Sequence, residues 1–305
     1  MKRRVFLAGA LAASALPLMG HSPYRKWSQY RARYTVIATD RTDPGSFLLG
    51  DRLAQRVAVR RPELRATAAR SQDARTVLSL LRTRQLELAL LRAEDAFQAA
   101  EGTGPYATLA TPLRVLAALA PEYLHIVVGA SSPVRAVGDL KGQRVGVVDG
   151  PGRARLKTQR IVAAYGLDPE ADVAWKSVAP GQGLSALGAG LVAAYCLEAS
   201  APAAELGPEQ RPAGVRLRLI QHGDALPALV ARHGPVYFPA PLGAERYPDV
   251  EAGVEVLAEA RLLVCREEYP PERARALVEA LAGWEELAPT GTPLPVPAHP
   301  ALSAG

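Results

Sequence analysis

The chain has 305 residues, of which 49% are hydrophobic and 22% are charged, and this composition is typical of a soluble globular protein. The size suits one two-lobed domain or two small domains, and the composition excludes an intrinsically disordered chain. The formal net charge of +6 is unevenly distributed, because residues 23–92 hold fifteen basic and six acidic side chains. No recognition motif or aromatic stacking pattern accompanies these arginines, so nucleic-acid binding is excluded. We interpret the basic surplus as a solvated, arginine-rich surface.

The amino terminus predicts an export signal over residues 1–22. Lys2, Arg3 and Arg4 form a charged start, and residues 5–19 are an apolar stretch that is too short and too weakly hydrophobic for a dedicated membrane span. The paired arginines also resemble the twin-arginine signal, while a Sec signal remains the alternative. We therefore expect a periplasmic protein, with a retained signal anchor as the second interpretation.

The first half of the chain alternates between strand and helix patterns. Buried strands are predicted over residues 34–39, 64–69 and 86–91, and amphipathic helices over residues 46–59, 73–81 and 94–100. This order predicts a parallel sheet with right-handed crossovers. Binding loops are then expected at the carboxyl ends of the strands.

The second half repeats this pattern around a glycine turn. Strands over residues 124–128 and 143–148 precede Gly150, Pro151 and Gly152, which open a helix over residues 153–164. Unpaired N–H groups and the helix dipole attract small anions at such a turn. Further strands are predicted over residues 173–178, 192–197, 215–220 and 254–264, and further helices over residues 184–187 and 271–287.

The sequence predicts no catalytic residue, metal site or cofactor, and hence no enzyme. His125 and His222 have no nucleophile or metal ligand at a suitable spacing, and no Gly-x-Ser-x-Gly motif occurs. Cys196 and Cys265 lie in apolar runs, so we expect both to be buried as small hydrophobic residues, with a disulfide as the alternative.

Three segments resemble the TAXI solute receptors of tripartite (TRAP) transporters. They are residues 87–99, residues 114–128 and the Asp-Leu-Lys-Gly-Gln-Arg-Val of residues 139–145, and the resemblance extends over roughly residues 34–288. Asp-Leu-Lys-Gly also occurs in ABC-type binding proteins of the same fold, and the segments before it favour the TAXI family.

The resemblance implies an α/β fold of the type II periplasmic binding protein kind, with two α/β lobes joined by two crossover strands. Lobe 1 would comprise residues 34–128 and 258–288, and lobe 2 residues 129–257. Residues 289–305 form a Pro-rich tail, which we expect to be an extended, loosely held strap.

The implied function is capture of a small anionic solute, such as a carboxylate, and its delivery to TRAP permease subunits in the membrane. We expect a monomer. Two alternatives remain open: an ABC-type substrate-binding protein of the same fold, and a receptor-derived module that interacts with a protein or acts as a sensor. The second alternative is motivated by the loss of glycines from the pocket motifs of the family.

The pocket motifs of the family are altered at three turns. Gly45, Ser46 and Phe47 stand at the Gly-Thr-Tyr positions, and we expect Phe47 to pack beneath the loop rather than against the ligand, although both are compatible. At the start of the lobe 2 helix, Arg153 and Arg155 would supply guanidinium donors that grip an anion bidentately. Arg92 and Arg41 would converge from lobe 1. The predicted ligand-binding residues are Thr39, Asp40, Ser46, Phe47, Ser71, Gln72, Asp73, Arg92, Gly152, Arg153, Ala154, Arg155 and Tyr195.

Overall fold

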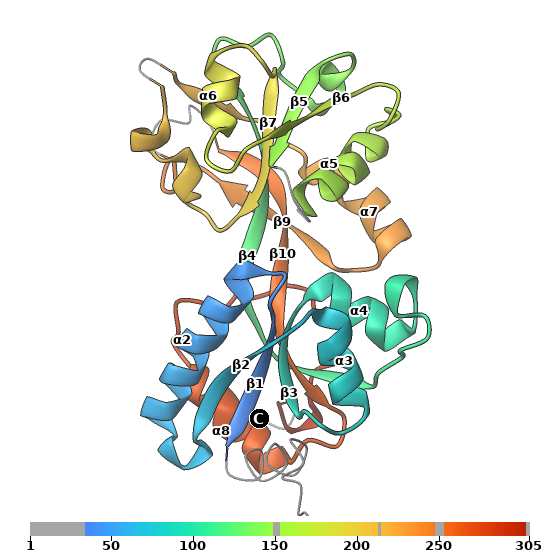
Figure 1. Ribbon diagram of the computed structural model, residues 1–305, viewed down its shortest axis with the longest axis vertical. Coiled ribbons are helices and arrows are strands. Elements are labelled where there is room, and N and C mark those ends of the chain that lie inside the picture. Colours follow the sequence, from blue (N-terminus) through green and yellow to red (C-terminus); the bar gives the residue numbers. More distant parts are fainter. Residues whose placement is uncertain (1–33, 149–152, 213–214, 248–252, 303–305) are drawn as a thin grey trace, which may run out of the picture.

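The computed structural model describes residues 34–148, 153–212, 215–247 and 253–302 (Figure 1). The predicted export signal and Gly152 lie outside these residues. No helix in the described ranges combines the length and the apolar content that a membrane span requires.

Lobe 1 is a sheet covered by helices on both faces, drawn in the lower half of Figure 1. Its strands are β1 (Thr35–Asp40), β2 (Ala66–Ser71) and β3 (Leu88–Arg92), and its helices are α2 (Pro44–Arg60), α3 (Ala74–Arg82), α4 (Ala93–Glu101) and α8 (Pro271–Leu281). β1 lies between β2 and β3 and is parallel to both. Successive side chains of β3 serve the two faces, because Leu88 and Leu90 pack in the same core as α2 and α8 while Ala89 and Leu91 pack with α3 and α4.

Lobe 2 repeats this construction in the upper half of Figure 1. Its strands are β5 (Arg144–Val148), β6 (Ala174–Val178), β7 (Ala194–Ala199), β8 (Leu217–Leu219) and β9 (Tyr237–Leu242), and its helices are α5 (Arg153–Ala164), α6 (Gly183–Gly188) and α7 (Leu226–His233). β5 is parallel to β6 and to β7. β9 is an edge strand that was not predicted from the sequence.

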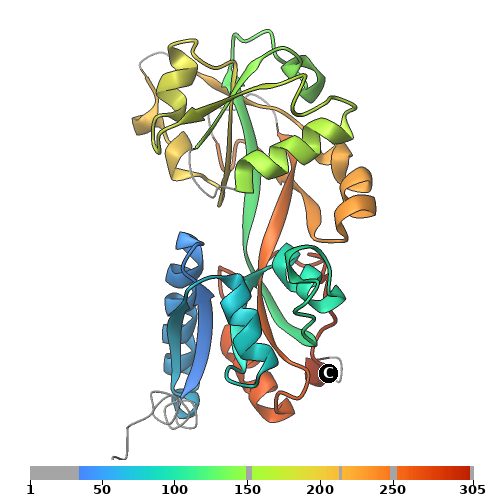
Figure 2. The same ribbon diagram turned by 45° about the vertical axis from the view of Figure 1, so that its right-hand side comes forward.

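Two long strands, β4 (Leu113–Gly129) and β10 (Val254–Arg266), run through the waist between the lobes (Figures 1 and 2). β10 pairs with β9 in lobe 2 as far as Glu259 and with β3 in lobe 1 from Arg261 onward, and it is antiparallel to β4 along the way. β4 continues into lobe 2 beside β7 and β8. The resulting strand order is β2-β1-β3-β10-β4-β7-β5-β6. The predicted fold class, an α/β fold with two lobes joined by two crossover strands, is confirmed.

The Pro-rich tail is held more firmly than we expected. Val115 of β4 donates to the carbonyl of Pro297 and accepts from the amide of His299, each at 2.9 Å. Val296 and His299 are both buried, so this part of the tail is anchored to lobe 1. Two backbone hydrogen bonds and the burial of Val296 offset the conformational entropy that is lost when this segment is ordered.

Candidate functional site

A cavity of about 540 Å³, here called the interlobe cavity, lies between the lobes. Its lobe 1 wall comes from the carboxyl ends of β1 and β3 and from the turn after β1. Its lobe 2 wall comes from the start of α5, the end of β7 and the segment that follows β7. The carboxyl ends of parallel strands meet at one edge of a sheet, which explains why residues far apart in sequence share this cavity.

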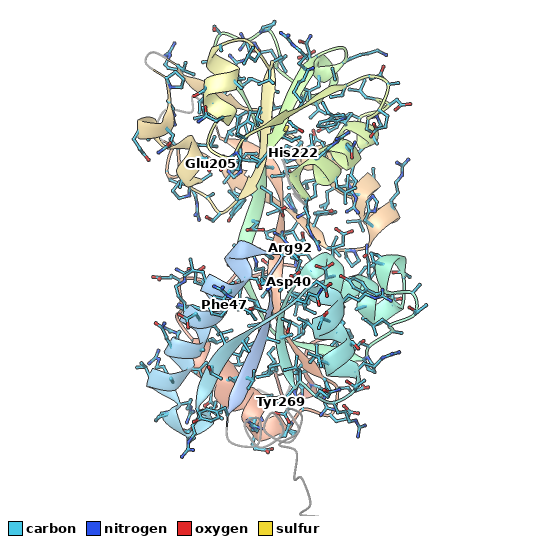
Figure 3. All side chains as sticks on the ribbon, viewed as in Figure 1. Asp40, Phe47, Arg92, Glu205, His222 and Tyr269 are labelled. Atoms are coloured by element: carbon cyan, nitrogen blue, oxygen red, sulfur yellow. The ribbon has the colours of Figure 1, made fainter. Side chains whose placement is uncertain are left out.

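Four of the predicted ligand-binding residues line the interlobe cavity. They are Asp40 and Arg92 from lobe 1, which lie close together in Figure 3, and Arg153 and Ala154 from lobe 2.

Three predicted residues of lobe 1 have other partners. Thr39 is buried and donates from its hydroxyl to the carbonyl of Ala69 at 3.1 Å. The guanidinium of Arg70 lies over the ring of Phe47, with its Cζ 3.8 Å from the ring centroid. Asp73 caps α3 by accepting from the amide of Thr76 at 2.7 Å.

Ser46, Ser71 and Gln72 are not among the described residues that line the cavity. Ser46 is buried, and its hydroxyl has no hydrogen-bond partner among the described residues. Arg41 is exposed and also lies outside the described cavity wall.

The two predicted arginines of α5 point in different directions. Arg153 lines the cavity, whereas Arg155 is half exposed and lies 5.6 Å from the ring centroid of Trp175. Two positions along a helix turn a side chain by about 200°, while positions three, four and seven apart share one face. Helical spacing therefore places Arg153, Lys157 and Arg160 on one face of α5 and Arg155 on another. This spacing was missed in the sequence, where both arginines were assigned to the ligand.

Arg92 is the centre of an ion-pair cluster at the waist. Its guanidinium lies 3.2 Å from Asp43, 2.7 Å from Glu122 and 2.8 Å from Glu198. Burial alone would lower the pKa of Arg92, but Glu198, Glu122 and Asp43 together raise it well above its usual range. The guanidinium is therefore a permanent cation that is already paired with three carboxylates of the protein.

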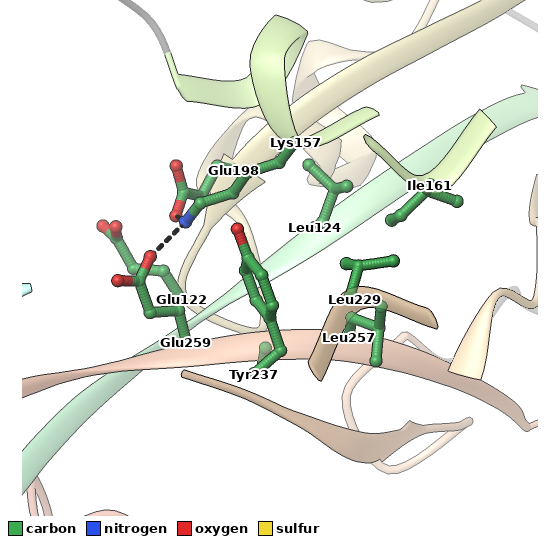
Figure 4. Close-up of a pocket in the computed structure, with 10 residues that line it drawn as sticks. Glu122, Leu124, Lys157, Ile161, Glu198, Leu229, Tyr237, Leu257 and Glu259 are labelled. Carbon is green, nitrogen blue, oxygen red and sulfur yellow. Dashed lines mark hydrogen bonds and ion pairs between the residues drawn. The ribbon is translucent and has the colours of Figure 1, made fainter. Parts of the chain in front are cut away.

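Lys157 is buried between Glu259 and Glu198, the second of which also pairs with Arg92 (Figure 4). Burial would raise the pKa of Glu259, but the charges of Lys157 and Arg92 hold it below its ordinary value. The small cavity beside this pair measures about 10 Å³, and its wall includes the ring of Tyr237. Such a volume holds no more than about one water molecule, so it is not the solute site.

The ion pairs at the waist form one cluster of seven residues around Arg92 and two separate pairs, Arg153–Asp95 and Arg160–Glu94, which together are called the interlobe ion-pair network. Its acidic members are Asp43, Glu94, Asp95, Glu122, Glu198 and Glu259, and its basic members are Arg92, Arg153, Lys157, Arg160 and Arg261.

Apart from contacts made by the crossover strands β4 and β10 themselves, three ion pairs among the described residues cross between the lobes. Arg92 of lobe 1 meets Glu198 of β7, Arg153 meets Asp95 of α4 at 2.5 Å, and Arg160 meets Glu94 of α4 at 2.7 Å.

The acidic members were missed in the sequence, although one signal was present. Glu259 and Arg261 interrupt an otherwise apolar strand pattern, and both are buried in the structure. Buried charges are expected to be paired, so charged residues inside such a run indicate partners elsewhere in the chain.

The histidines and cysteines belong to the core. His125 Nε2 lies 2.6 Å from the Tyr247 hydroxyl, and His222 Nε2 lies 2.9 Å from the carbonyl of Leu124. Burial lowers the pKa of both histidines to about 4. Cys196 and Cys265 are buried free thiols, as predicted, and burial raises the pKa of each to about 12. Within the described part of the chain, no group of three or more acidic, His or Cys side chains is arranged to hold a metal ion.

Comparison with known proteins gives one family and several distant structures. The sequence matches the NMT1-like family over residues 37–300. XAC2383 from Xanthomonas citri bound to chloride ion has a TM-score of 0.46 at 12% identity, over 82% of this chain and 83% of that one. The periplasmic aliphatic sulphonate binding protein SsuA from Escherichia coli has a TM-score of 0.42 at 17% identity, over 75% of this chain and 65% of that one. A mutant of arginine-bound ArgBP from T. maritima has a TM-score of 0.37 at 14% identity, over 84% of this chain and 98% of that one.

Proposed function

The chain belongs to the NMT1-like family, and from this premise we propose that it is a solute-binding receptor that encloses a small molecule between its lobes. The observation that carries the proposal is the interlobe cavity, whose wall comes from both lobes. Its volume of about 540 Å³ is within the usual range for small-molecule sites. A ligand that contacts both walls would shift the population toward the closed arrangement.

We propose a periplasmic location and delivery of the solute to a membrane permease. The location is supported by the predicted export signal over residues 1–22. The resemblance to TAXI receptors favours a TRAP permease, and the Asp-Leu-Lys-Gly motif is equally compatible with an ABC permease. Uptake of labelled solute by membranes that carry one or the other permease would distinguish the two.

An anionic solute such as a carboxylate is the sequence-based prediction for this site. It is supported by Arg92 and Arg153, the basic side chains on the described cavity wall. Both arginines already hold protein carboxylates, so an incoming carboxylate would compete with Asp95 or with the three partners of Arg92.

One specific observation supports the non-transporting interaction module as a second candidate. Side chains of the protein itself join the lobes, through Arg92–Glu198, Arg153–Asp95 and Arg160–Glu94. A protein that closes upon itself in this way would have less need of a ligand.

A thermal-shift screen of the purified protein against a metabolite library tests the receptor. We expect stabilisation by one ligand class, of about 2.7 kcal/mol when the ligand is present at a hundred times its dissociation constant. Ala154→Trp should abolish this shift, because Ala154 lines the interlobe cavity and an indole would fill it. Ala171→Trp is the matched control, since Ala171 is exposed on lobe 2 away from the cavity. Uniform silence across the library would favour the interaction module.

A further inference from the structure

The charges on the wall of the interlobe cavity indicate which solute it takes. The acidic residues of the described wall are Asp40, Asp43, Glu198 and Glu205, and the basic residues are Arg92 and Arg153. We propose that the solute is a small cation, bearing ammonium or guanidinium groups that pair with Asp40 and Glu205. This inference rests on the proposed receptor function and names the chemical class of its ligand.

Asp40 supplies a fixed carboxylate on the lobe 1 side. It ends β1, it is 9% exposed, and its Oδ1 accepts from the amide and the hydroxyl of Thr42, each at 2.7 Å. Among the described side chains no base lies within ion-pair distance of it, although the residue lines the cavity. A buried carboxylate without a cation is costly, and a positively charged ligand would remove that cost.

Glu205 supplies the matching carboxylate on the lobe 2 side, in the short 3-10 helix Ala204–Leu206. The Tyr195 hydroxyl donates to Glu205 Oε2 at 2.7 Å and fixes its orientation. Burial, reinforced by Glu205, raises the pKa of Tyr195, so the phenol stays protonated and remains a donor. The Tyr195 ring packs directly on Gly183, where a Cβ would lie 2.2 Å from Cζ. Glu205, like Asp40, has no basic partner within ion-pair distance in the described part of the chain.

The two carboxylates belong to opposite lobes, with Asp40 below Glu205 in Figure 3. A solute with two positive groups would therefore contact both lobes at once and favour closure. Charge-assisted hydrogen bonds to carboxylates are stronger than neutral ones, which would add specificity for amines.

An anion would meet the opposite situation. The guanidinium of Arg92 is shared among three carboxylates, and Arg153 is held by Asp95. Like charges at short distance repel strongly in a partly buried site, so an anion would face the unpaired Asp40 and Glu205 without a free cation on the described wall.

Titration calorimetry with a matched set of probes tests the inference. Putrescine, succinate and the corresponding butane diol have the same number of carbon atoms and differ in charge. We expect heat from putrescine and none from succinate or the diol. Asp40→Asn and Glu205→Gln should each weaken putrescine binding at least about tenfold, because each removes one charged acceptor. Glu63→Gln, a change of an exposed acid on lobe 1, should leave binding unchanged. Thermal melts of all variants establish that they are folded.

The outcomes separate the ligand class from the receptor function. Binding of succinate without putrescine, or putrescine binding that neither Asp40→Asn nor Glu205→Gln weakens, would overturn the cationic class and leave a receptor. If only a neutral compound of the library binds, the cationic class is overturned and the receptor function stands. Silence toward these probes and toward the whole library would overturn the receptor itself.

Discussion

At the scale of single residues, the chain places titratable groups where water cannot reach them. His125 of β4 and His222 are fully buried, and a hydrogen bond fixes each ring, to the Tyr247 hydroxyl for His125 and to the carbonyl of Leu124 for His222. Their folded pKa values of about 4 lie below the ordinary value of 6.5, because burial penalises the charged imidazole.

These histidines predict an acid-sensitive stability. Between pH 6.5 and 4 the unfolded chain binds protons at both histidines while the folded chain does not, so the free energy of unfolding should fall as the pH falls through this window. Urea denaturation at several pH values between 6.5 and 5 measures the slope of the free energy of unfolding against pH, in a range above the pH at which most carboxylates titrate. In the double variant His125→Gln and His222→Gln the slope should flatten. A slope that is the same in this variant would show that other groups are responsible.

At the scale of elements, two ion pairs join α5 to α4 across the waist. Arg153, Lys157 and Arg160 recur on one face of α5, and the acids Glu94 and Asp95 lie in the first turn of α4. A helix amino terminus stabilises acids through its dipole, so α4 presents two carboxylates that α5 can pair. Tyr237 of β9 adds its hydroxyl, which lies 2.6 Å from Arg160.

A double-mutant cycle tests the contact between these helices. Glu94→Gln and Arg160→Met should each destabilise the protein, and their combined effect should be smaller than the sum, with a coupling energy of about 0.5–3 kcal/mol. The matched pair is Arg61→Met with Glu279→Gln, an exposed ion pair whose coupling should be at most about 1 kcal/mol. Unfolding by urea measures both cycles. Equal coupling in the two cycles would mean that the α4–α5 contact contributes no more than a surface pair.

The elements also show how far sequence patterns predict this fold. The buried strands and most helices were predicted within a few residues, because their apolar periodicity is regular. The first half of β4 was missed, since Arg114, Pro121 and Glu122 interrupt its pattern and Ala120 has a positive φ of 37°. β9 was missed because Pro239 and Pro241 lie in it, which an edge strand with its prolines exposed tolerates.

The site was less predictable than the fold. Of the arginines that the sequence indicated, Arg92 and Arg153 line the interlobe cavity, whereas Arg41 and Arg155 do not. The ion-pair partners are distant in sequence, as with Arg261 and Asp43, which lie 218 residues apart and 2.7 Å from each other. Local patterns carry no information on such pairs. The charge balance of the cavity therefore emerges only when the lobes are assembled.

At the scale of the whole molecule, the two crossover strands seen in Figure 2 connect the lobes. Among the described residues, the ion pairs Arg92–Glu198, Arg153–Asp95 and Arg160–Glu94 connect them further. Strands that pass between domains form a natural hinge, and ion pairs across the opening bias it toward closure. Arg92, Arg153 and Glu198 both tie the lobes and line the interlobe cavity, so closure and the charge of the cavity depend in part on the same residues.

The double variant Glu94→Gln and Asp95→Asn tests whether the ion pairs hold the lobes together. Removing both acids leaves Arg153 and Arg160 unpaired at the waist, and their desolvation then favours opening toward water. Small-angle X-ray scattering should show a larger radius of gyration for this variant than for the unmodified protein. The control variant Glu63→Gln and Glu268→Gln removes two exposed acids and should leave the radius unchanged. An unchanged radius in the Glu94 and Asp95 variant would mean that packing along β4 and β10 fixes the lobes and that the ion pairs do not control the opening.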